Sequence, residues 1–101
     1  MQNMTINKKS EGEKLTLTLS GRLDTNTSPA LEAELKHSVD GVKELIFDFS
    51  DVEYISSAGL RILLAAQKVM NRQGSMKLIG VNADVMEVFE ITGFSDILTI
   101  E

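Results

Sequence analysis

The stretch Leu45–Leu64, LIFDFSDVEYISSAGLRILL, decides the fold, because an apolar strand pattern in it runs through a polar segment into a helix pattern. Its first part, Leu45–Phe49, is apolar except for Asp48, which predicts a central strand covered on both faces. Asp48 fits either an exposed edge position or a buried group that needs partners. Asp51 and Glu53 then indicate a loop that leads to the helix.

Two serines, Ser56 and Ser57, stand where this helix is expected to begin. Open α/β sheets carry their functional sites beyond the C-terminal ends of their strands, which is where this sequence puts the serines. Unpaired N–H groups and the positive end of the helix dipole stabilise negative charge at such a place. Ser56 is the expected N-cap, since its side chain can accept from an early helix N–H. A serine that receives a phosphate is the simplest interpretation of the site.

The rest of the chain alternates strand and helix patterns from residue 15 onward, which indicates parallel strands joined by right-handed crossovers. A hairpin is expected before that, and a polar loop at 21–27. The sequence predicts one α/β domain over residues 1–101, a mixed sheet of four to five strands with the later ones parallel, and three to four helices. The remaining strands are expected at Thr5–Lys8, Leu15–Leu19, Met76–Val81 and Ile97–Ile100, and the helices from Ser28 to Gly41, from Ser57 to Gln73 and from Asn82 to Gly93.

The long helix carries two sets of apolar residues. At about 100° per residue, one set forms a single stripe that we predict to be the core face; it comprises Ala58, Ile62, Ala65, Ala66 and Val69. Leu60 and Leu64 fall on the opposite side, with Ser57 and Arg61. Isolated exposed leucines are common, so their position can be chance. We favour a partner-docking face, because the two leucines are stacked one turn apart beside the serine.

Composition excludes several classes of function. The net charge of −5 and the lack of a basic run argue against nucleic acid or an anionic membrane surface as partner. The chain has no cysteine, which excludes disulfides and thiolate metal sites. It shows neither an 18-residue apolar stretch nor a signal-peptide pattern, so we expect a cytoplasmic protein without membrane insertion. His37 is the single histidine, and no catalytic or cofactor motif accompanies Ser57. We therefore predict that it is not an enzyme and needs no cofactor or metal.

Three segments occur in the order found in one family: Gly21–Asp24, Asp51–Leu60, and Val88-Phe89 with Thr92–Phe94. The whole chain resembles a bacterial STAS domain of the anti-sigma-factor antagonist type. The resemblance implies that the unphosphorylated protein binds an anti-sigma factor that is also a serine kinase, which frees the sigma factor. Phosphorylation of one serine would release this partner, and a PP2C-type phosphatase would reset the protein.

The family serine lies two residues before Gly-Leu, which corresponds to Ser57, and several members carry aspartate where this chain has Ser56. The resemblance also implies that Asp24 lies beside the phosphorylation site. The expected partner-binding surface is Asp24, Thr25, Asn26, Ser56, Ser57, Ala58, Leu60, Arg61 and Leu64. STAS domains also serve as subunits of lipid-transport ABC systems and in stress-signalling scaffolds, which is the alternative function. We expect a monomer or a weak dimer.

Overall fold

The computed structural model describes residues 4–101, and its central feature is one mixed sheet with the strand order β1-β2-β3-β4. β1 pairs with β2 antiparallel, while β2–β3 and β3–β4 are parallel. This confirms the predicted fold class. The strands are β1 (Met4–Glu11), β2 (Lys14–Leu23), β3 (Glu44–Ile55) and β4 (Ser75–Ile79), and the helices are α1 (Ser28–Ser38), α2 (Ser57–Gln73), α3 (Ala83–Thr92) and the short 3-10 helix η1 (Phe94–Asp96).

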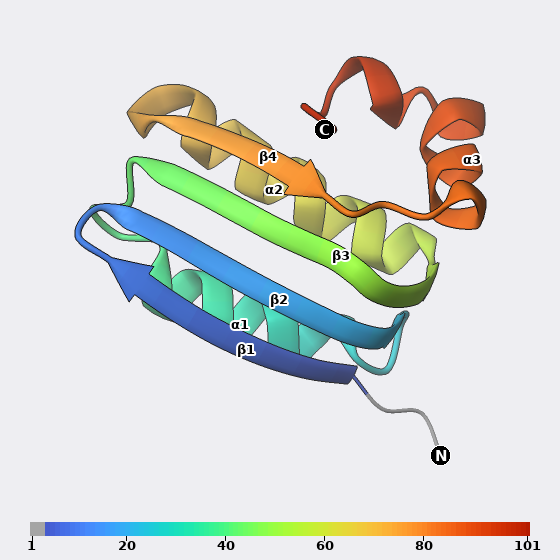
Figure 1. Cartoon of the computed structure of the whole chain (residues 1–101), viewed down its shortest axis with the longest axis horizontal. Helices are drawn as coiled ribbons and strands as arrows, with labels where there is room; N and C mark the ends of the chain where they lie inside the picture. The colour runs from blue at the N-terminus through green and yellow to red at the C-terminus, as the bar shows by residue number, and fades with distance from the viewer. Residues whose placement is uncertain (1–3) are drawn as a thin grey trace.

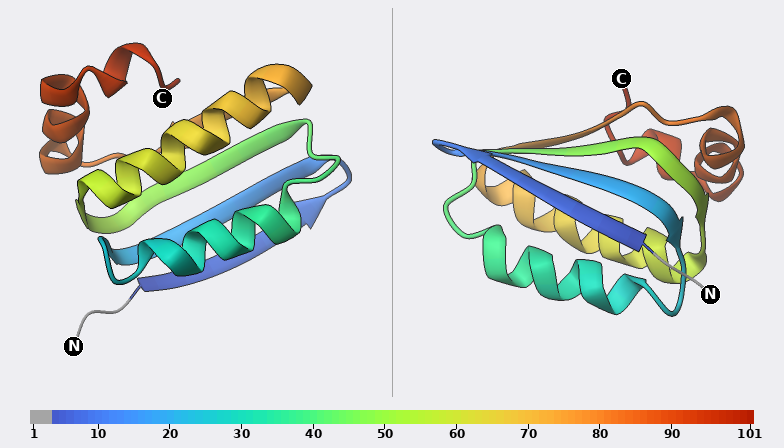
Figure 2. Two further views of the ribbon diagram at one scale, coloured as in Figure 1. Left: turned by 180° about the vertical axis from the view of Figure 1, so that it is seen from behind. Right: turned by 60° about the horizontal axis from the view of Figure 1, so that its bottom comes forward.

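Helices α1 and α2 lie side by side on one face of the sheet, and α3 lies beyond the ends of β3 and β4 (Figures 1 and 2). The expectation that the central strand is covered on both faces was therefore wrong. The connections β2–α1–β3 and β3–α2–β4 each lead to the adjacent strand in the same direction across the sheet. Because parallel crossovers share one handedness, both connections place their helix on the same face. Phe47 and Phe49 are buried on that face. Asp48 is half-buried on the other, where its carboxylate accepts from the N–H of Ser50 at 2.9 Å and from its hydroxyl at 2.6 Å.

The tight β1–β2 hairpin confirms the expected turn. Glu11 pairs with Lys14, so Gly12 and Glu13 form a two-residue loop. Gly12 has a φ of +62°, which suits the first position of a type II′ turn, the form that matches the twist of the flanking strands.

Strands β2 and β3 are longer than predicted, because the residues expected to form loops continue the ladder. The pairing runs on to Leu23 and Ile55 through two irregularities, at Thr18/Ser20 and Gly21/Arg22. In each, β3 contributes one more residue than β2, as in a β-bulge. The predicted loops at 21–23 and at 51–55 were therefore wrong. The two strands end together, which brings the segments that follow them into contact.

The predicted core face of α2 was also wrong. The buried residues of this helix are Gly59, Leu60, Leu63, Ala66, Gln67 and Met70. Leu60 is only 6% exposed, whereas Ala65 is exposed and Ile62 is half-buried. Close packing at Gly59 accounts for this rotation. A Cβ there would lie 2.8 Å from Cγ of Leu23 and 2.9 Å from Cγ1 of Ile55, so Gly59 faces the ends of the two central strands.

The termini of α3 follow their capping signals, whereas the expected Ser28 N-cap of α1 was wrong, because Ser28 lies inside that helix. The Asn82 side chain accepts from the N–H of Val85 at 2.8 Å, and Gly93 ends α3 with a φ of +83°. Helix α1 starts at Ser28 with Thr27 as its N-cap, and it ends at Ser38, before the expected Gly41. The strand predicted at Ile97–Ile100 was wrong, because this segment, which follows η1, makes a single parallel bridge between Ile100 and Leu78 in place of a ladder.

Candidate functional site

The site is built where β2 and β3 end side by side. Leu23 pairs with Ile55, and the N–H of Ser56 donates to the carbonyl of Leu23 at 2.9 Å. The loop that begins at Asp24 therefore lies directly beside the start of α2. This is the C-terminal edge of parallel strands, where open α/β folds place functional groups.

Ser57 is the first residue of α2, and its side chain is exposed. Ser56 occupies the N-cap position with φ −102° and ψ 176°, as predicted, but its side chain caps no N–H of the helix. The Oγ of Ser56 is shielded from solvent and has no hydrogen-bond partner within residues 4–101. The first turn contains no acidic residue. The N–H groups and the dipole of this turn are thus available to a negative charge on Ser57.

Asp24 organises the neighbouring loop. Its Oδ1 accepts from the N–H of Asn26 at 3.0 Å and from the N–H of Thr27 at 3.1 Å, and the Nε of Arg22 lies 3.6 Å from its Oδ2. Burial raises the pKa of this carboxyl, but the hydrogen bonds from Thr27 and Asn26, together with the charge of Arg22, outweigh burial and hold the pKa below its usual value. Asp24 is therefore an ionised structural anchor at neutral pH.

Thr27 is a site residue that sequence reasoning missed. It is buried, and its Oγ1 donates to the carbonyl of Arg22 at 2.6 Å while accepting from the N–H of Asp24 at 2.9 Å. These bonds close the loop on itself and leave Thr25 and Asn26 exposed at its tip. A threonine three residues after an aspartate and directly before Ser28-Pro29 was the available signal, since such spacings favour side-chain bonds to loop N–H groups.

The structure brings most of the predicted surface together at one end of the molecule. Arg61 is exposed, and Ala58 and Leu64 are half-buried. Leu60 is the exception: it belongs to the hydrophobic core, so its predicted place on an exposed docking face was wrong. Of the predicted core stripe of α2, Ala66 is in the core as predicted, while the other members line the grooves beside α1; these are Ala58, Ile62, Ala65 and Val69.

A groove separates the first turns of α1 and α2. It is lined by Thr25, Ser28, Pro29, Glu32, Ala58, Arg61, Ile62 and Ala65. Farther along the two helices, a more apolar groove is lined by Glu32, Leu35, Lys36, Val39, Ile62, Ala65, Ala66 and Val69. Glu32, Ile62 and Ala65 line both grooves, so the two grooves adjoin along α1 and α2.

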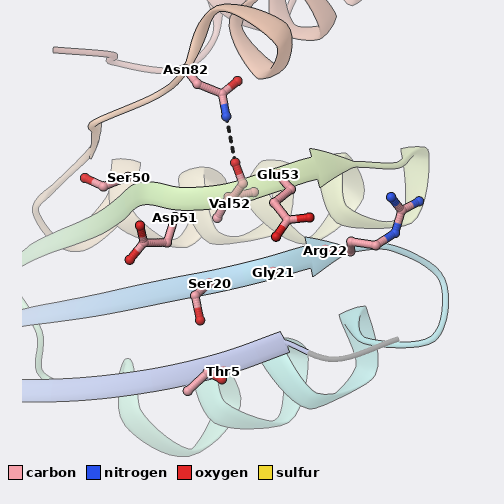
Figure 3. Close-up of a pocket in the computed structure, with 9 residues that line it drawn as sticks. All are labelled: Thr5, Ser20, Gly21, Arg22, Ser50, Asp51, Val52, Glu53 and Asn82. Atoms are coloured by element: carbon pink, nitrogen blue, oxygen red, sulfur yellow. Dashed lines mark hydrogen bonds between the residues drawn. The ribbon is translucent and has the colours of Figure 1, made fainter. Parts of the chain in front are cut away.

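A third groove lies on the sheet face that carries no helix, near the ends of β2 and β3 (Figure 3). Asp51 and Glu53 contribute carboxylates to it, and Arg22 lies at its rim with its guanidinium 4.2 Å from the ring centre of Tyr54. The side chain of Asn82 closes one side by donating to the carbonyl of Val52 at 2.8 Å.

Two further properties bear on the class of protein. Within residues 4–101, no cluster of three or more His, Cys, Asp or Glu side chains is arranged to hold a metal ion. In the same part of the chain, every helix is too short or too polar to span a bilayer.

Comparison with known proteins agrees with this geometry. The family model described as the STAS domain matches residues 5–101. BtrV of Bordetella bronchiseptica, described as a putative anti-sigma factor antagonist, is 40% identical over 84 residues, which cover 81% of this chain and 72% of BtrV. The crystal structure of an anti-sigma factor antagonist from Mycobacterium paratuberculosis superposes with a TM-score of 0.88 at 24% identity, over 97% of this chain and 85% of that one. SpoIIAA from Bacillus, solved in its phosphorylated form, has a TM-score of 0.75 at 17% identity, over 96% and 91% of the two chains.

Proposed function

Because the chain belongs to the STAS domain family, we propose that it is an anti-sigma factor antagonist controlled by phosphorylation of Ser57. In its unphosphorylated form it binds an anti-sigma factor that is also a serine kinase, and the sigma factor is released. The observation that carries the proposal is the exposed Ser57 at the N-terminus of α2, beside the ordered Asp24 loop. The description of BtrV as a putative antagonist supports the same function.

The choice of Ser57 over Ser56 rests on access. A kinase must reach the hydroxyl that it modifies, and the side chain of Ser57 is exposed whereas the Oγ of Ser56 is shielded. The position of Ser57 also tolerates the product, because a phosphate at a helix N-terminus is stabilised by about 0.3–1 kcal/mol. Phosphorylation therefore acts on partner binding rather than on folding.

The energy needed for release is modest. A hundredfold loss of affinity corresponds to about 2.7 kcal/mol. Two like charges about 4 Å apart repel by about 4 kcal/mol at an effective dielectric constant of 20. One acidic group of the partner, or one phosphate of its bound ATP, facing the phosphorylated Ser57 would be sufficient.

The surface that remains for the partner is Asp24, Thr25, Asn26, Ser56, Ser57, Ala58, Arg61 and Leu64. Leu60 no longer belongs to it, because its side chain is in the core. We further propose that the protein acts in the cytoplasm as a monomer or weak dimer, that it has no catalytic activity of its own, and that a PP2C-type phosphatase removes the phosphate.

The deciding experiment incubates the wild-type protein, Ser57→Ala and Ser56→Ala with the cognate anti-sigma factor kinase and ATP, followed by mass spectrometry. We expect one phosphate on the wild type and on Ser56→Ala, and none on Ser57→Ala. A parallel affinity titration should show that the kinase binds Ser57→Ala and fails to bind Ser57→Asp. Labelling of Ser57→Ala at the wild-type rate would refute the assignment, and equal binding of both variants would refute the switch.

A further inference from the structure

Arg61 lies one helical turn from Ser57, and it has no carboxylate partner within the described residues 4–101. The ion pairs within residues 4–101 join Lys8 to Glu34, Arg22 to Asp24, and Lys77 to Glu101. Residues four apart on a helix are surface neighbours, with Cβ atoms about 5–6 Å apart. The guanidinium of Arg61 can therefore reach a group attached to the Ser57 side chain.

The groove between α1 and α2 supplies a second observation. Ser28 lines it together with Arg61, and Ser28 is only 3% exposed. Its Oγ has no hydrogen-bond partner within residues 4–101. Buried hydroxyls are normally hydrogen-bonded, so this donor lacks an acceptor. Its Oγ is shielded from solvent, so the Ser28 side chain would have to rotate toward the groove to donate to a phosphate there.

We propose that Arg61, assisted by the hydroxyl of Ser28, binds the phosphate of phosphorylated Ser57 within the same molecule. This deepens the proposed function and rests on it. A phosphoserine carries roughly −1.5 to −2 charges and three acceptor oxygens, and arginine binds phosphate with paired, charge-assisted hydrogen bonds. The unmodified hydroxyl offers no such partner, so the interaction exists only after phosphorylation.

The acidic groups around the site do not prevent this pairing. Asp24 is engaged by Arg22 and by the N–H groups of its own loop. Glu32 lines the same groove from α1, but it carries one charge and forms no ion pair with Arg61. Phosphorylation would thus add negative charge and at the same time withdraw Arg61 from the surface offered to the partner.

The test uses the full chain with phosphoserine installed at position 57 during synthesis, so that it needs no kinase. Phosphorus NMR measures the second pKa of the phosphate in the otherwise unchanged protein and in Arg61→Gln, Arg61→Lys and Ser28→Ala. Arg72→Gln is the matched control, because Arg72 is an exposed arginine on the same helix, about 22 Å from Ser57 along the helix axis. That distance exceeds the screening length at physiological salt, which is about 8 Å.

We expect Arg61→Gln to raise the phosphate pKa by about 0.3–0.7 pH unit, since the dianion loses its nearest cation. Arg61→Lys should raise it less, Ser28→Ala should raise it slightly, and Arg72→Gln should leave it unchanged. An unchanged pKa in Arg61→Gln, or an equal rise in Arg72→Gln, would overturn the proposal. An unchanged pKa in Ser28→Ala would remove Ser28 from it. If a kinase never modifies Ser57, the proposed function fails while this titration still decides the inference.

Discussion

Asp24 stabilises its loop more strongly in the ionised form, which accepts from two loop N–H groups and lies beside Arg22. The pKa of Asp24 in the folded protein lies below its ordinary value of 3.8. Ionised Asp24 therefore stabilises the folded protein. This stabilisation is fully present above the pKa of the unfolded chain and is lost as the pH falls through the pKa of the folded protein. We predict that Asp24→Asn lowers the free energy of unfolding at neutral pH and that this difference shrinks at about pH 3. Urea denaturation of both proteins at the two pH values measures it, with the exposed Glu32→Gln as control for losing one surface charge. A difference that grows in acid would contradict the assignment.

Leu60 and Ile62 exchange the roles that the sequence suggested for them. Leu60 is fully part of the core, while Ile62 is half-buried beside the α1–α2 groove. Leu60→Ala should therefore lower the free energy of unfolding by about 2–5 kcal/mol, as core deletions do. Ile62→Ala should cost clearly less. Urea titrations of the two variants decide between the two helix orientations, and a larger loss in Ile62→Ala would restore the original one.

At the scale of the elements, Gly59 determines which side of α2 faces the sheet. A methyl group there would overlap Leu23 and Ile55, both of which are buried at the ends of their strands. Overpacking costs about 1–3 kcal/mol, which exceeds the gain of about 1 kcal/mol from replacing glycine by alanine in a helix. We predict that Gly59→Ala is destabilising overall in thermal melts. Ala65→Gly, on the exposed side of the same helix, measures the difference in helix propensity between alanine and glycine alone. A Gly59→Ala protein that melts at a higher temperature than the wild type would refute the packing argument.

The elements that were predicted correctly carry strong local signals. Asn82 caps the start of α3 with its side chain, Gly93 ends α3 in the left-handed conformation, and Gly74 ends α2 at a place where a Cβ would overlap the backbone of Lys43. The extension of β3 through Asp51 and Glu53 had no such signal, because it depends on bulges in the pairing with β2. The orientation of α2 was equally hidden. Both of its stripes are apolar, and only the contact of Gly59 with two distant strands distinguishes them.

For the whole molecule, sequence patterns predicted the alternation of strands and helices, the parallel central strands and the position of Ser57 at a helix start. They could not predict that both long helices lie on one face, since this follows from the direction in which successive strands are added. The candidate site was likewise predicted only in part, because some of its features depend on how the elements pack. Its residues were found from local patterns, but Thr27 and the groove depend on contacts between elements.

Phosphorylation of Ser57 should leave the whole molecule folded while it abolishes partner binding. The added charge meets the free N–H groups of α2 and lies on an exposed side chain, so no buried group has to move to accommodate it. We predict that the phosphorylated protein keeps the thermal stability of the unmodified one or gains up to about 1 kcal/mol, and that its backbone NMR shifts change only around Asp24–Ser28 and the first turns of α2. Its affinity for the kinase should fall at least about a hundredfold, which corresponds to about 2.7 kcal/mol. Widespread shift changes across β4 would instead show that the modification rearranges the fold, because β4 pairs with β3 only as far as Asp48, away from the site.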